Sequence, residues 1–132
     1  LLPRVRWAAS PPSARPCWLE IGFGGGEHLA TLAARHPEVS FIGCEPFQNG
    51  VAKLLSAIES RGLKNIRIHP DDARDVLRAL PPGSVERAYI LYPDPWPKSR
   101  HHKRRLVNRE LLDLLAVILV PGGFVQLATD HE

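Results

Sequence analysis

Five short apolar runs alternate with segments of helical periodicity along this chain, and this alternation limits its possible folds more than any other feature. The runs are bounded by turn residues and predict strands at 17–23, 39–45, 65–69, 85–92 and 124–129. Strands that alternate with helices need crossover connections, and such connections give a parallel sheet with helices on both faces. The sequence therefore predicts an α/β fold.

The segments between the predicted strands carry apolar residues at helical spacing and end in residues that stop helices. The expected helices lie within 25–36, 51–58, 73–80 and 111–119. Gly62 is placed to stop the second helix, and Asn108 is placed to cap the fourth. Pro121, Gly122 and Gly123 are expected to end the fourth helix before the last strand.

The length of 132 residues suits one domain with a core, so we expect an irregular lead-in at 1–16 and one domain at 17–132. No apolar run approaches the length of a membrane span, and the first residues do not resemble a secretory signal. We therefore expect a cytoplasmic protein with no membrane association.

Cys17 and Cys44 are expected to be small buried hydrophobic residues rather than part of a disulfide framework.

Carboxylates lie at or just past the end of every predicted strand, which is where open α/β sheets bind their ligands. They are Glu20, Glu45, the Asp71-Asp72 pair, Asp94 and Asp130. Each alone could be an exposed loop acid. Together they predict the rim of a pocket.

The glycine loop after the first strand has the pattern G-x-G-x-G, formed by Gly22, Gly24 and Gly26. A dinucleotide fingerprint needs a third glycine at position 27, which is Glu27 here. Glu20 and Glu27 flank the loop and would repel a pyrophosphate, whereas Glu20 suits a cation such as the ammonium of an amino acid. The alternative is a glycine turn that binds nothing.

The next two strand ends fit the other parts of a nucleoside ligand. Glu45 can accept hydrogen bonds from two ribose hydroxyls. Asp72 can accept from the exocyclic amino group of adenine while the Ala73 amide donates to the ring. Asp72 could instead cap a helix, and Glu45 could be a surface residue. An amino-acid end, a ribose and an adenine in this order indicate S-adenosyl-L-methionine (AdoMet) as the cofactor.

The segment 92–105 joins a proline-rich corner to a basic strip. Prolines on both sides fix the backbone around Asp94, and Trp96 offers a face on which a base could stack. The basic strip can pair with phosphates, so it predicts nucleic-acid binding, although a solvated charged surface would look the same. Its residues are Lys98, Arg100, His101, His102, Lys103, Arg104 and Arg105.

His36 and His69 give no sign of a metal site. They have no partner at the spacing of metal ligands, so we predict no metal. We expect both to be surface or turn residues.

The motifs LEIGFGGGEHL, GCE, DDA, YPDPWPKSRHHKRRLV and LATD occur in this order over 17–132, and they resemble the bacterial tRNA (guanine-N7)-methyltransferase family. The resemblance implies a Rossmann-like class I methyltransferase sheet, AdoMet as methyl donor and N7 of a guanine in tRNA as acceptor. It implies a catalytic Asp94, which also lies at the cofactor, and a substrate contact by Asp130. Since the family's domain continues further, we expect the sheet to be truncated after the fifth strand.

Without the resemblance, the residue chemistry leads only to an AdoMet-dependent enzyme acting on nucleic acid. Asp94 could stabilise the cationic purine that methylation at N7 produces, or hold the edge of the guanine. The alternatives are an AdoMet-dependent methyltransferase with another target and an RNA-binding module made inactive by truncation. A monomer and a homodimer are both compatible with the sequence.

Overall fold

Strands and helices alternate along the chain in a computed structural model that describes residues 16–91 and 108–128. The strands are β1 (Cys17–Ile21), β2 (Ser40–Cys44), β3 (Ile66–His69), β4 (Val85–Leu91) and β5 (Leu119–Ala128). The helices are α1 (Glu27–Arg35), α2 (Gln48–Arg61), α3 (Ala73–Ala79) and α4 (Arg109–Ile118). None of the helices in these described ranges is long and apolar enough to cross a membrane.

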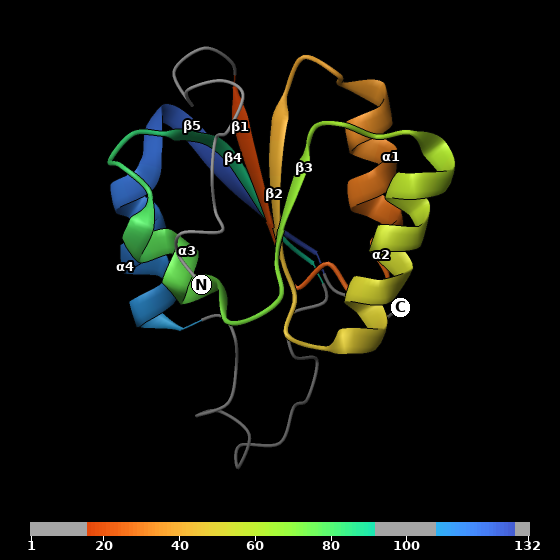
Figure 1. Cartoon of the computed structure of the whole chain (residues 1–132). Helices are drawn as coiled ribbons and strands as arrows, with labels where there is room; N and C mark the ends of the chain where they lie inside the picture. Colours follow the sequence, from red (N-terminus) through yellow and green to blue (C-terminus); the bar gives the residue numbers. More distant parts are fainter. Residues whose placement is uncertain (1–15, 92–107, 129–132) are drawn as a thin grey trace.

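The strands form one parallel sheet in the order β3-β2-β1-β4-β5. Helices α1 and α2 cover one face, and α3 and α4 cover the other (Figure 1). The predicted α/β fold is confirmed. The chain moves outward from β1 to β3 and then returns to place β4 on the other side of β1. This reversal beside the central strand is a topological switch point, where open sheets of this kind bind ligands.

Each face of the sheet has its own apolar core. Leu29, Phe41 and Leu54 are buried between the sheet and the helices α1 and α2. Ile42 and Ile90 are buried on the other face, under α3 and α4. Because both faces are covered, the strands are largely apolar on both sides, which explains why their sequences are nearly continuous apolar runs.

The helix ends follow the sequence signals. The Asn108 side chain accepts a hydrogen bond from the Leu111 N–H at 2.9 Å and so caps α4 as predicted. Gly62 ends α2 in the left-handed conformation with φ 65°, and its N–H donates to the Ile58 carbonyl.

The last strand differs from the prediction because it starts at Leu119, directly after α4, rather than at residue 124. Val85 pairs with Leu119, whereas Arg87 pairs with Phe124, so β5 contains extra residues between these two pairs. The Pro121-Gly122-Gly123 step is accommodated within the strand as an irregularity of the register.

His69 corrects another expectation, because it is a buried residue rather than a surface or turn residue. It ends β3 with 1% exposure, and its Nε2 lies 3.3 Å from Asp75 Oδ2. The expectation for His36 is confirmed, since it is half-exposed at the end of α1, with its ring 4.9 Å from that of Trp18. Cys17 and Cys44 are free and buried, as predicted.

Gly26 precedes α1 and has φ 84°, a conformation that L side chains rarely adopt. A Cβ placed on it would lie 2.7 Å from Leu54 Cδ1 of α2. This glycine therefore lets the start of α1 pack directly against α2.

Replacing Gly26 and Gly62 separately by alanine distinguishes packing from backbone strain, because both have positive φ but only Gly26 is crowded. We expect Gly62→Ala to lower the free energy of unfolding by about 1 kcal/mol through strain alone. Gly26→Ala should cost about 1–3 kcal/mol more, the usual cost of overpacking. Urea unfolding measures both free energies. Equal losses of stability in the two variants would show that the Leu54 side chain moves away from the new methyl group at no cost.

Candidate functional site

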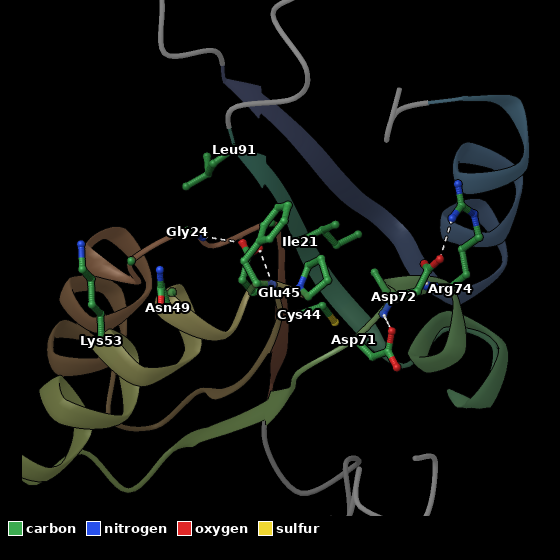
Figure 2. Close-up of a pocket in the computed structure, with 16 residues that line it drawn as sticks. Ile21, Gly24, Cys44, Glu45, Asn49, Lys53, Asp71, Asp72, Arg74 and Leu91 are labelled. Atoms are coloured by element: carbon green, nitrogen blue, oxygen red, sulfur yellow. Dashed lines mark hydrogen bonds and ion pairs between the residues drawn. The ribbon is translucent and has the colours of Figure 1, made fainter. Parts of the chain in front are cut away.

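A cavity of about 850 Å³ opens at the carboxyl ends of the strands (Figure 2). The wall comes from the loop after β1, the end of β2 with the start of α2, the loop between β3 and α3, and the end of β4. This volume lies within the range of small-molecule pockets, about 300–1,000 Å³. The lining residues are Ile21, Gly22, Gly24, Gly25, Cys44, Glu45, Pro46, Phe47, Asn49, Gly50, Lys53, Asp71, Asp72, Ala73, Arg74 and Leu91.

Glu45 is the most deeply buried of the acids that line this cavity in the described part of the chain. It follows β2 and is only 5% exposed. Its Oε1 accepts a hydrogen bond from the Gly24 N–H at 2.7 Å, and its Oε2 accepts one from the Phe47 N–H at 3.2 Å. Each carboxylate oxygen can accept a further bond, so Glu45 can hold the loop after β1 and still bind hydroxyl groups of a ligand.

Asp72 lines the cavity and also caps α3. The helix cap considered in the sequence analysis is therefore present, and the residue also faces the cavity. Its Oδ1 accepts from the Arg74 N–H at 2.9 Å, and its Oδ2 lies 2.8 Å from Arg74 Nη1. Arg74 also lies 3.2 Å from Glu110 Oε1 of α4. Ala73 lies in the cavity wall beside Asp72. The loop between β3 and α3 is therefore tied to α4 through one arginine.

Glu20 lies inside β1 and is only 1% exposed. Its Oε1 is 2.8 Å from Nδ1 of His28 on α1, and its Oε2 has no hydrogen-bond partner within the described ranges. Burial raises the pKa of Glu20, while the hydrogen bond and the charge of His28 act in the opposite direction. Of the residues around it, Ile21 and Gly22 line the cavity, whereas Glu20 itself is not among the lining residues described.

The glycines of the loop after β1 have separate roles. Gly22 and Gly24 line the cavity, and the Gly22 N–H donates to the Cys44 carbonyl at 2.8 Å. Gly26 is explained by its packing against Leu54. The predictions that Gly22, Gly24 and Gly26 contact a cofactor remain predictions.

The sequence analysis did not predict that α2 forms one wall of the cavity. Asn49 and Lys53 lie one helical turn apart on the face that borders Gly24 (Figure 2). Phe47 lines the cavity just before α2 and is 74% exposed. A Cβ on Gly50 would collide with the Gly24 carbonyl oxygen, so this glycine allows α2 to touch the loop. A glycine inside a helical pattern was the available signal, because it often marks such a close approach.

Several predicted site residues lie outside the described part of the chain. They are Asp94, Trp96, Lys98, Arg100, His101, His102, Lys103, Arg104 and Asp130. Within the ranges that the structure describes, no group of three or more His, Cys, Asp or Glu side chains is arranged to hold a metal ion.

The strand order, the glycine loop after β1 and the buried carboxylate after β2 together define an α/β domain of the class I methyltransferase type. Residues 14–132 match a protein family described as "Putative methyltransferase", and the chain belongs to this family. The resemblance to bacterial tRNA (guanine-N7)-methyltransferases inferred from the motifs is confirmed by curated relatives.

Two of these relatives carry the name tRNA (guanine-N(7)-)-methyltransferase. The protein from Paracoccus denitrificans is 55% identical over 88% of this chain and 50% of its own length. The protein from Caulobacter vibrioides is 48% identical over 98% of this chain and 61% of its own length. The chain thus spans between half and about three-fifths of the length of these two curated relatives.

Solved structures with low sequence identity share the fold. A SAM-dependent methyltransferase from Thiobacillus denitrificans in complex with S-adenosyl-L-homocysteine has a TM-score of 0.63, with 22% identity over 86% of this chain and 42% of that chain. A 16S rRNA (adenine(1408)-N(1))-methyltransferase from Catenulisporales acidiphilia has a TM-score of 0.64, with 20% identity over 88% of this chain and 52% of that chain.

Substitution of Gly50 tests the contact between α2 and the glycine loop. At an uncrowded helix position, replacing glycine by alanine stabilises by up to about 1 kcal/mol. At Gly50 we expect the opposite sign, a loss of about 1–3 kcal/mol, because the new methyl group meets the Gly24 carbonyl oxygen. Ala52→Gly, at an exposed position of the same helix, measures the difference in helix propensity between alanine and glycine alone. Stabilisation by Gly50→Ala in urea unfolding would contradict the contact.

Proposed function

We propose that this chain is an AdoMet-dependent methyltransferase that transfers a methyl group to N7 of a guanine in tRNA. The observation that carries the proposal is 55% identity, over 88% of the chain, to a protein named tRNA (guanine-N(7)-)-methyltransferase. The cavity at the switch point of the sheet supports it, because Glu45 and Asp72 line it after the neighbouring strands β2 and β3 and can accept hydrogen bonds from a nucleoside.

The lining residues fit the cofactor. Glu45 would accept from the ribose hydroxyls with the lone pairs that Gly24 and Phe47 leave free. Asp72 would accept from the adenine amino group, and the N–H of Ala73, in the first turn of α3, would donate to the ring. The exposed ring of Phe47 lies at the same wall.

When bound, AdoMet supplies a methyl group on a positively charged sulfur. N7 of guanine carries an available lone pair, so no residue has to remove a proton from it first. The protein then acts by holding two reactants in line and by stabilising charge. Asp94, which follows the cavity residue Leu91 closely in the sequence, is the residue proposed to stabilise charge.

The partner proposed for the basic strip is tRNA. The segment 98–105 carries five Lys or Arg residues, which suit a phosphate backbone. Trp96 is proposed to stack on the target base, and Asp130 to contact the substrate. A tRNA substrate also supports a cytoplasmic location.

Glu45→Ala should weaken binding of S-adenosyl-L-homocysteine by about 1.5–3 kcal/mol, the value of hydrogen bonds to a charged group. Isothermal titration measures the affinity. Glu59→Ala, which removes an exposed carboxylate of α2 that does not line the cavity, should leave the affinity unchanged. Equal affinities for the Glu45 variant and the parent would remove Glu45 from the site.

The reaction itself is tested by incubating the chain with methyl-labelled AdoMet and unmodified tRNA, followed by digestion to nucleosides. We expect the label in 7-methylguanosine. Asp94→Asn, which removes the charge and keeps the shape, should slow single-turnover transfer by about 10²–10³-fold.

Other results of this assay point to the other functions. Label in a different nucleoside would mean another nucleic-acid target. Binding of tRNA with no transfer and no AdoMet affinity would mean an RNA-binding module. A rate of the Asp94 variant close to that of the parent would assign Asp94 a role in loop shape only.

A further inference from the structure

The pair formed by Glu20 and His28 is a buried contact that the cavity does not explain. Glu20 is in the central strand, where Gly43 of β2 and Tyr89 of β4 flank it in the sheet. His28 Nδ1 lies 2.8 Å from Glu20 Oε1 and comes from the first turns of α1, directly after the glycine loop. One oxygen is therefore bonded, while Oε2 is buried without a partner in the described part of the chain.

An unpartnered buried carboxylate oxygen is costly, because it has given up its water without a replacement. Native proteins seldom keep such an atom unless something binds it. The next two residues of the chain, Ile21 and Gly22, line the cavity. Oε2 is thus an unpartnered acceptor on the residue that directly precedes the cavity wall in the chain, and a cation would satisfy it best.

The groups around this pair hold the imidazole in place. The Tyr89 ring lies 5.3 Å from the His28 ring in an edge-on arrangement. The Tyr89 hydroxyl accepts a hydrogen bond from Arg87 Nη1 at 3.3 Å. Gly43, on the β2 side, has no side chain that could compete for Glu20. Among the described residues, His28 is the group whose charge acts on Glu20.

We propose that His28 is a positioning residue for Glu20: it binds Oε1, fixes the direction of the carboxylate, and leaves Oε2 for the ammonium group at the amino-acid end of the cofactor. This inference rests on the proposed function, because it takes AdoMet or its product as the ligand. It assigns a role to a histidine that lies within the motif LEIGFGGGEHL but for which the sequence analysis predicted no role. The ligand contact belongs to Glu20, and His28 acts through it.

The arrangement also predicts how binding depends on pH. Only ionised Glu20 can pair with an ammonium, so this part of the affinity is present above the pKa of Glu20 and is lost as the pH falls through it. Burial raises that pKa and His28 lowers it. Removing His28 should therefore raise the pKa further and move the loss of affinity to higher pH.

Two ligands and two variants test the proposal. S-adenosyl-L-homocysteine carries the ammonium, whereas 5′-methylthioadenosine has the same nucleoside without the amino acid. His28→Leu removes the hydrogen-bond donor; His28→Asn keeps a donor near the place of Nδ1 but cannot take a proton. Isothermal titration of both ligands with each variant, between about pH 5 and pH 8, covers the range where carboxylate and imidazole titrate in proteins.

In His28→Leu we expect affinity for S-adenosyl-L-homocysteine to fall about tenfold or more at neutral pH, as for loss of a hydrogen bond to a charged group. Its acid midpoint should move to higher pH, because the hydrogen bond and charge that lower the pKa of Glu20 are removed. Affinity for 5′-methylthioadenosine should stay unchanged, which also shows that the variant is folded. His28→Asn should retain most of the parent affinity for both ligands.

The possible failures are distinguishable. Equal losses for both ligands, or no loss for either, would overturn the positioning role while leaving the proposed cofactor in place. Failure of the parent chain to bind either ligand would overturn the proposed function and this inference together. As a further control, His28→Leu in a Glu20→Gln background should change neither affinity, because the carboxylate through which His28 acts is then absent.

Discussion

The candidate site depends on the hydrogen bonds that the Glu45 carboxylate accepts from two backbone N–H groups. One oxygen binds Gly24 of the loop after β1, and the other binds Phe47 at the start of α2. A buried carboxylate is stable only where such donors replace its water. The same carboxylate thus fixes two walls of the cavity relative to each other and faces the space between them. The glycine at position 50 permits this closeness by letting α2 touch the loop.

The sheet places that interaction where a ligand can reach it. Because β1 is central and the chain reverses beside it, the loops after β1, β2 and β3 meet at one edge, next to the end of β4. The two apolar cores, one on each face, fix the helices that carry the polar wall residues. The function that we propose therefore depends on local loops held by a rigid and apolar framework.

Much of this could be predicted from the sequence, because the fold follows from the alternation of apolar runs and helical spacing. The positions of Glu45 and Asp72 at the cavity follow from the rule that open α/β sheets bind ligands beyond the carboxyl ends of their strands. The contacts of His28 and His69 could not be predicted in the same way. Each depends on which helix face meets which strand, and that is decided by packing between distant segments. The strand β5 was misjudged because proline and glycine usually end an element, whereas here the irregular register includes them.

Because of the ion pairs around Arg74, the Asp72 side of the cavity should respond to dissolved salt more strongly than the Glu45 side. Asp72 is held by an arginine whose second partner, Glu110, is half-exposed and also binds Arg78. Dissolved salt screens such exposed pairs, whereas the backbone donors that hold Glu45 are sheltered from it. At high ionic strength the loop before α3 should loosen first, while the loop after β1 keeps its shape. High salt would then disturb the part of the cavity wall that carries Asp72 before it disturbs the framework.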